Sequence, residues 1–297
     1  MNGKNHRYII FAIIWAITLG VWAGEMFGQV RQSSKDHYAK LLLLEAKPEP
    51  GFEKLDSMTF PLSDWGPLMS WKLLRTYYAT KPFEKFPSLG VPANSSKRTR
   101  AELDYLQDLQ RTRTREELAW SLKLASIYYN PMIVNPADKQ YVANRENLFY
   151  LGRSLGGWFR REELPLTEDL LSKVVHDATV YIVDFKLKYA RPRPYVLEPA
   201  LKVDQPLPHG AFPSGHSFTS YVNAEILIRL APDRKDDLLN AAHEFAWSRE
   251  LLGVHYPSDS EAGRVLAHDF VKSLFENEQF MKDFQTVKNE WAEKRIK

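Results

Sequence analysis

From Arg100 onward, apolar residues recur every three or four positions among charged residues, and this spacing constrains the fold more than any other feature. Such a period places apolar side chains on one face of a helix. Alternating patterns that would indicate β-hairpins are scarce. The sequence therefore predicts an all-α, single-domain helical bundle, with an apolar stripe carried first by Leu103, Leu106, Leu109, Leu118, Leu122 and Leu124. Further helices are expected at about 141–161, 167–188, 216–230, 233–252 and 259–275, and the charged tail from Glu276 to Lys297 is expected to be a solvated helix.

The chain has 297 residues, 44% of them hydrophobic, which is enough for one substantial core. Residues 24–99 contain repeated prolines and glycines between short apolar pieces, which predicts an irregular wrapping region with one or two helices. Residues 100–297 are the expected helical core, and the segments that carry chemistry fall within 186–259.

Charge and cysteine content exclude several classes of protein. The 40 basic and 37 acidic side chains are mixed along the chain, so no basic stripe indicates nucleic-acid binding. The chain has no cysteine, which excludes disulfides, thiolate metal sites and a cysteine nucleophile.

The N-terminus resembles an export signal. Lys4 and Arg7 precede a mostly apolar run from Tyr8 to Gly24, and Val21 and Ala23 fit a small-residue cleavage site. We expect residues 1–23 to be a signal peptide and the protein to be periplasmic or secreted. The alternative is an uncleaved membrane anchor, because a run of this length is at the short limit for spanning a bilayer.

The first chemical segment contains two cations. Lys186 lies near the end of an expected helix and Arg193 follows seven residues later, whereas the residue seven before Arg191 is the acidic Asp184. The pair of interest is therefore Lys186 and Arg193, an ammonium and a guanidinium that can hold phosphate oxygens. The alternative is a basic helix end that complements the helix dipole.

The second segment is the start of a helix. Ser214 immediately precedes an amphipathic run, so it is expected to be the N-cap, with Gly215 and His216 in the first turn. The unpaired N–H groups of a first turn form an anion cradle, to which the Ser214 hydroxyl can add a hydrogen bond. The alternatives are a plain helix cap and a surface histidine.

The third segment contains a cation, a histidine and an aspartate. Arg249 ends one expected helix, Gly253 stops it, and His255 and Asp259 flank a tight turn. An aspartate in that place can accept the Nδ1 proton of His255 and leave Nε2 free to attack phosphorus. A pair that merely ties a loop together is the alternative.

In this order the segments resemble the phosphatidic acid phosphatase type 2 superfamily, whose pattern is Lys-x6-Arg-Pro, Pro-Ser-Gly-His and Ser-Arg-x5-His-x3-Asp. Residues 165–290 are most similar to the class A bacterial non-specific acid phosphatases, which implies a bacterial source. The resemblance implies the fold of the acid phosphatases and vanadium haloperoxidases. It also implies the following roles: His255 as nucleophile, Asp259 as its orienting carboxylate, His216 as acid and base, and Lys186, Arg193, Ser214, Gly215 and Arg249 as phosphate ligands.

The implied function is a metal-independent acid phosphatase that acts on small phosphomonoesters through a phosphohistidine, without a cofactor and with vanadate as inhibitor. A phosphotransferase side activity and a homo-oligomer remain open. The first alternative is a vanadium-dependent haloperoxidase, and the second is an inactive phosphate-binding protein. A metallophosphatase is a weaker alternative, for which the ligands would be His209, His268 and Asp269.

Overall fold

The computed structural model describes residues 38–61, 63, 65–66, 68–86 and 90–295, and all regular secondary structure in them is helical. The predicted all-α class is confirmed. Residues 44–297 form one compact unit. The predicted signal segment lies outside the described residues. Among the helices that are described, none is both long and apolar enough to span a bilayer.

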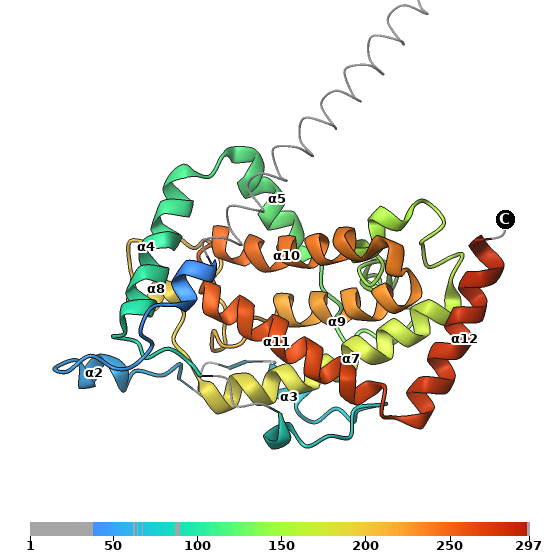
Figure 1. The fold of residues 1–297 in the computed structure, drawn as a ribbon, viewed down its shortest axis with the longest axis horizontal. Coiled ribbons are helices and arrows are strands. Elements are labelled where there is room, and N and C mark those ends of the chain that lie inside the picture. Colours follow the sequence, from blue (N-terminus) through green and yellow to red (C-terminus); the bar gives the residue numbers. More distant parts are fainter. Residues whose placement is uncertain (1–37, 62, 64, 67, 87–89, 296–297) are drawn as a thin grey trace, which may run out of the picture. The chain divides into compact units, whose positions relative to one another are not determined.

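Four helices surround the core of the compact unit. They are α7 (Pro165–Tyr189), α9 (Gly215–Leu230), α10 (Lys235–Leu251) and α11 (Pro257–Leu274). Their observed bounds lie within two residues of the predicted ones. Helix α9 packs against the other three (Figure 1). It is central because its apolar side chains are distributed around the helix, and Phe218, Val222, Ile226 and Leu227 are fully buried.

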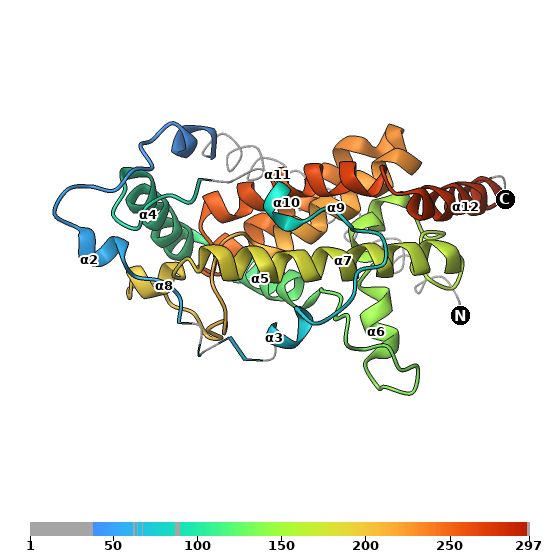
Figure 2. The ribbon, with the colours of Figure 1, turned by 90° about the horizontal axis from the view of Figure 1, so that it is seen from below.

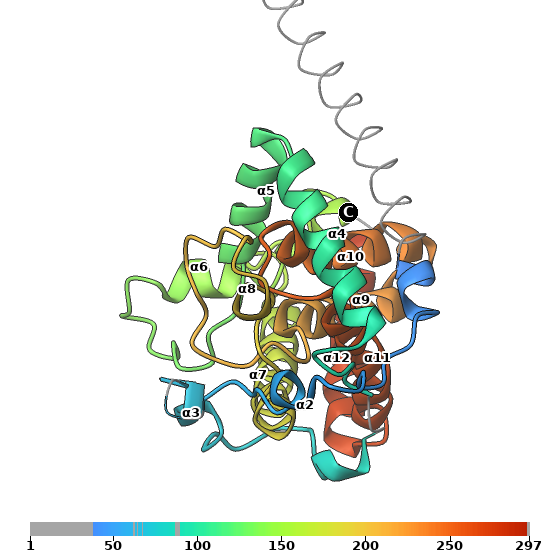
Figure 3. The same ribbon diagram turned by 90° about the vertical axis from the view of Figure 1, so that its left-hand side faces the viewer.

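The N-terminal half adds short elements and then two longer helices. The short elements are α2 (Glu53–Asp56), α3 (Leu68–Trp71) and η2 (Phe83–Lys85). Helix α4 (Lys97–Thr112) begins at Ser96, whose hydroxyl accepts from Thr99 N–H, and α5 (Arg115–Ser126) begins with a capping box of Thr114 and Glu117. Both helices pack against α10 (Figure 3).

The single helix predicted over 141–161 is wrong. The structure has α6 (Tyr141–Glu146), then a turn, then η3 (Tyr150–Leu155), which is interrupted at Gly152. The Phe159 ring folds back onto this glycine so closely that a Cβ there would lie 2.2 Å from it. Gly156 supplies the left-handed turn with φ of 109°. This contact, which a helical period does not encode, divides the segment.

The C-terminal tail is a helix as predicted, but it is not simply solvated. Helix α12 (Glu278–Arg295) packs on α7 (Figure 2) and buries Phe280, Phe284, Val287 and Trp291, which share one face. The buried Glu290 carboxylate accepts hydrogen bonds from the N–H groups of Leu166 and Thr167 and so caps α7. Two more short elements, α8 (Pro194–Leu197) and η4 (Pro232–Arg234), complete the unit.

The start of α9 is held close to α11. Ser214 N–H donates to the Asp259 carbonyl at 2.9 Å, and the Ser217 hydroxyl donates to the Ser260 carbonyl at 2.6 Å. Gly263 permits this approach, since a Cβ there would lie 2.9 Å from both Phe218 N and the Ser214 carbonyl oxygen. The two segments containing His216 and Asp259 are thus fixed to each other by backbone contact.

We expect Gly263→Ala to lower the free energy of unfolding by about 1–3 kcal/mol, because the methyl group would meet two backbone atoms and Ser217 Cβ, none of which is the far end of a flexible side chain. Urea unfolding measures the loss. Gly157→Ala is the matched control, since a Cβ at Gly157 meets nothing within 4 Å. Equal stability of the two variants would contradict the close approach.

Candidate active site

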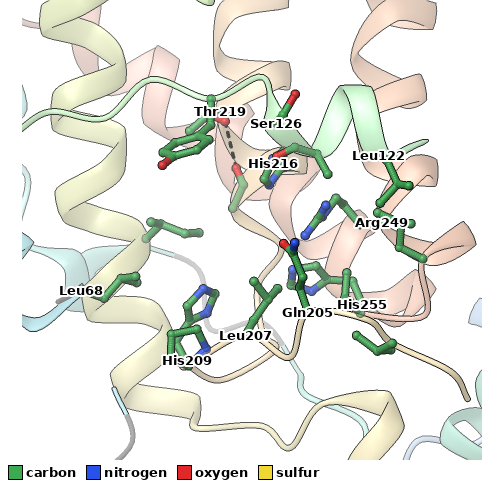
Figure 4. A pocket seen from close by; sticks show the side chains of 18 of the residues that line it. Leu68, Leu122, Ser126, Gln205, Leu207, His209, His216, Thr219, Arg249 and His255 are labelled. Atoms are coloured by element: carbon green, nitrogen blue, oxygen red, sulfur yellow. Dashed lines mark hydrogen bonds between the residues drawn. The ribbon is translucent and has the colours of Figure 1, made fainter. Parts of the chain in front are cut away.

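The three predicted segments converge on one cavity of about 800 Å³ (Figure 4). Its polar wall contains Lys186 from the last turn of α7, Gly215 and His216 from the first turn of α9, Arg249 from the last turn of α10, and His255 from the α10–α11 connection. The remaining predicted residues, Arg193, Ser214 and Asp259, do not line the cavity. They contact the residues that do.

His255 is oriented by Asp259, as the spacing predicted. Its Nδ1 lies 3.0 Å from Asp259 Oδ2, which also accepts Tyr256 N–H at 3.0 Å. Because a carboxylate accepts and a guanidinium donates, Nδ1 carries the proton, and Nε2 accepts a hydrogen bond from Arg193 Nη1 at 3.0 Å. Burial, together with Arg193 and Lys186, holds the pKa of His255 well below its usual value. The ring is therefore neutral, with the Nε2 lone pair directed at a cation.

Lys186 and Arg193 are tied to the loop that precedes α9. The Lys186 ammonium donates to three carbonyls, those of Gly210, Ala211 and Pro213, at 2.7–3.1 Å. Arg193 donates through Nε and Nη2 to His209 and through Nη1 to the Val254 carbonyl. Burial lowers the pKa of Lys186 well below its usual value and that of Arg193 to about 10. Both cations thus hold the loop in place, and Lys186 acts on the cavity mainly through its charge.

Arg249 differs from these two cations because its donors are not fully used. It is 5% exposed, it lines the cavity, and its Nε has no hydrogen-bond partner. Burial, and then the nearby Arg193 charge, lower the pKa of Arg249 to about 9. A buried cation with an unpaired donor is unfavourable unless an anion completes it.

The start of α9 supplies a cap and a histidine. The Ser214 hydroxyl accepts the Ser217 N–H, which confirms the predicted N-cap, and Gly215 lines the cavity. His216 Nε2 donates to the Ala125 carbonyl at 3.1 Å, in the last turn of α5. Burial, followed by the charge of Arg249, lowers the pKa of His216 to about 3. His216 is therefore neutral near neutral pH.

Sequence reasoning missed the role of Arg191, because the residue seven positions before it is the acidic Asp184 and not a second cation. Arg191 is buried and its Nη1 donates to Asp259 Oδ1 at 2.7 Å, while Nη2 lies 3.2 Å from Glu102 Oε2. Glu102 was not singled out either. Its position four residues before Leu106 places a carboxylate on the buried face of α4, which is a signal that could have been used.

The residues considered for a metallophosphatase lie apart. His209 is held by Arg193, and His268 Nδ1 contacts Glu225 Oε1 at 3.2 Å on the outside of α11. Across the ranges that the structure describes, no group of three or more His, Asp or Glu side chains is suited to hold a metal ion.

The helices that carry the three segments match a known protein family. Residues 170–275, which run from α7 to the end of α11 and include every predicted site residue, match the PAP2 superfamily. The chain contains a PAP2 superfamily domain. Helices α4 and α5, which contact the PAP2 domain through Arg191 and His216, lie outside the matched residues.

Curated relatives bear out the resemblance to bacterial non-specific acid phosphatases. The chain is 30% identical over 137 residues to a non-specific acid phosphatase of Providencia stuartii, which is 44% of this chain and 55% of that protein. It is 27% identical over 143 residues to an acid phosphatase of Zymomonas mobilis, 45% of this chain and 52% of that one. The chain thus matches only about half the length of each of these relatives.

A solved structure supports the fold. The crystal structure of a bacterial vanadium-dependent iodoperoxidase superimposes with a TM-score of 0.52 and 17% identity, covering 82% of this chain and 65% of the other. The predicted fold of the acid phosphatase and haloperoxidase type is confirmed. At this identity the likeness concerns the fold alone.

Proposed function

We propose that this chain is an acid phosphatase that hydrolyses small phosphomonoesters through a phosphohistidine at His255. The observation that carries the proposal is Arg249, a buried cation with an unpaired donor in the cavity wall that also contains His255. A phosphoryl oxygen would supply the acceptor that the Arg249 donor lacks, in the charge field of Lys186 and Arg193. In this proposal the Ser214 hydroxyl and the Gly215 N–H would also bind phosphate oxygens.

The proposed reaction has two displacements. In the first, His255 Nε2 forms a bond to phosphorus while the bond to the alkoxide oxygen breaks and His216 supplies the proton to that oxygen. In the second, water attacks the phosphohistidine, His216 takes the proton from the water, and the bond from phosphorus to Nε2 breaks. Each transition state places additional charge on the equatorial oxygens, where fixed cations stabilise it more than they stabilise the substrate.

The proton of the first step has to arrive with the substrate. His216 is neutral near neutral pH, because burial and nearby cations lower its pKa to about 3. A bound phosphate compensates those cations and so raises the pKa of His216. Phosphomonoesters have a second pKa of about 6, so the monoanion that prevails below this pH can deliver the proton. The proposed mechanism therefore predicts a higher rate in acid.

We expect His216→Ala to reduce kcat far more for an alkyl phosphate than for nitrophenyl phosphate, since a good leaving group needs little protonation. The difference between substrates should be about 10²–10⁴-fold, the usual contribution of a general acid. Steady-state kinetics on the two esters measures it. Equal losses would indicate that His216 binds phosphate and does not act as the acid.

A panel of phosphomonoesters, assayed across pH with and without EDTA, tests the proposed function directly. Turnover that survives EDTA supports a metal-independent phosphatase. Halide oxidation that requires added vanadate would instead support a haloperoxidase. Phosphate binding without turnover would support an inactive binding protein.

We also propose that the protein is exported and cleaved after Ala23. The support is the apolar run from Tyr8 to Gly24. N-terminal sequencing of the exported fraction should begin at Gly24, whereas an intact Met1 on membrane-bound protein would favour the anchor.

A further inference from the structure

We infer that Glu102 and Arg191 are positioning residues that fix the ionised Asp259 carboxylate and, through it, the reactive tautomer of His255. This inference rests on the proposed function, in which His255 Nε2 is the nucleophile. It assigns a catalytic consequence to α4, which lies outside the residues that match the PAP2 superfamily.

The first step is the contact between Arg191 and Asp259. Arg191 Nη1 donates to Asp259 Oδ1 at 2.7 Å, and the other carboxylate oxygen, Oδ2, accepts from His255 Nδ1 and Tyr256 N–H. Both oxygens of Asp259 are therefore occupied, and its carboxylate plane is fixed. Arg191 is itself held by stacking on the Tyr256 ring, with its guanidinium carbon 3.7 Å from the ring centroid.

The second step is the contact between Arg191 and Glu102. Glu102 Oε2 accepts from Arg191 Nη2 at 3.2 Å and from the Ser258 hydroxyl at 2.9 Å, and Oε1 accepts Ser258 N–H at 2.6 Å. The Ser258 hydroxyl in turn accepts from Arg191 Nη1 at 2.8 Å. Glu102 thus aligns the guanidinium and fixes the first turn of α11, which contains Asp259.

The third step is burial. Glu102 is 1% exposed, Arg191 2% and Asp259 0%, so water cannot replace any of these contacts. Arg191 is the cation that contacts both buried carboxylates, and a buried carboxylate is stable as an ion only beside its cation. If Arg191 is removed, one carboxylate must take up a proton, and a protonated Asp259 cannot accept the Nδ1 proton of His255 in the same way. The tautomer with the proton on Nε2, which cannot attack phosphorus, then becomes accessible.

The test compares Arg191→Met, Glu102→Gln and the double variant. Activity requires ionised Asp259, and the pKa of a carboxyl rises when a neighbouring cation is lost. In Arg191→Met the acid limb of kcat should therefore move to higher pH by about one unit or more. Adding Glu102→Gln to Arg191→Met removes the carboxylate that repels the Asp259 charge. The acid limb of the double variant should therefore return at least half of the way to its wild-type position. The other titratable or charged groups that interact with Asp259 are the same in all variants. They are Lys186, Arg193, Glu250, His255 and Tyr256.

Nitrogen NMR of histidine-labelled protein gives a readout that needs no turnover, because the ¹⁵N shifts of His255 report which ring nitrogen carries the proton. The Nδ1–H form should prevail in the wild-type protein and should be partly lost in Glu102→Gln, whose single amide oxygen cannot replace both Oε2, which accepts from Arg191, and Oε1, which accepts Ser258 N–H. In this variant kcat should fall about 10–100-fold with KM changed less than about twofold. If Arg191→Met does not fold, the measurements on Glu102→Gln alone test the inference.

Arg153→Met is the matched control, since it breaks an ion pair with the buried Glu244 on α10, away from the cavity. Its acid limb and tautomer should be those of the wild type. A wild-type tautomer in Glu102→Gln would overturn the inference even if kcat falls, since the residue would then have only a structural role. The same holds if the double variant has the acid limb of Arg191→Met. A wild-type protein with the Nδ1–H tautomer but no phosphatase activity would instead refute the proposed function.

Discussion

His255→Ala is expected to lower kcat by at least about 10⁴-fold, as the loss of a catalytic nucleophile does in other hydrolases, and to abolish the phosphoenzyme. The reason is that Asp259 holds the proton of His255 on Nδ1 and so directs the Nε2 lone pair toward the cationic wall. The other two histidines of the cavity are held differently, His209 by Arg193 and His216 by the Ala125 carbonyl. Rapid quench with a phosphomonoester labelled at phosphorus measures the phosphoenzyme directly.

The matched control is His268→Ala, which removes a histidine whose side chain is 67% exposed on α11 and lies 3.2 Å from Glu225 Oε1. It should leave kcat and the phosphoenzyme unchanged. A phosphoenzyme of wild-type amount in His255→Ala would show that the covalent step occurs on another residue.

Arg249→Ala is expected to lower kcat/KM by about 10²–10³-fold, the usual effect of removing one donor to a charged transition state. Inhibition by vanadate should weaken in parallel, because vanadate adopts the five-coordinate geometry that the cations are proposed to stabilise. Competitive inhibition constants in the wild type and the variant measure this. The folded protein should if anything be more stable without Arg249, since a buried cation with an unpaired donor is removed.

Arg249→Lys separates charge from geometry. Lysine keeps the positive charge but loses the planar fork, so it should recover substrate binding better than vanadate binding. Arg193→Lys should behave differently, because its guanidinium also holds His209 and Val254, and its loss should lower stability as well. Unchanged vanadate affinity in Arg249→Ala would contradict the assignment of Arg249 to the phosphate site.

The helical class and the local geometry of each segment followed from sequence alone. Helix bounds depend on the apolar period and on caps within a few residues, so the predicted bounds of α7, α9, α10 and α11 were close. The pairing of His255 with Asp259 and the cap at Ser214 are also local, because a single turn brings the partners together. The interrupted segment around Gly152 was predicted incorrectly, because its shape depends on packing against Phe159.

Only the tertiary structure decided how the site is held and charged. Glu102 and Arg191 are separated by 89 residues, and Ala125 and His216 by 91, so no spacing within a motif could have paired them. The tertiary structure also shows that Lys186 is tied by three carbonyls whereas Arg249 keeps an unpaired donor. The lowered pKa of His216 has the same origin, since burial removes the water that would stabilise a charged ring. Residue types and short spacings therefore determined which groups the site contains, whereas long-range packing and the exclusion of water decided which of them are free to act.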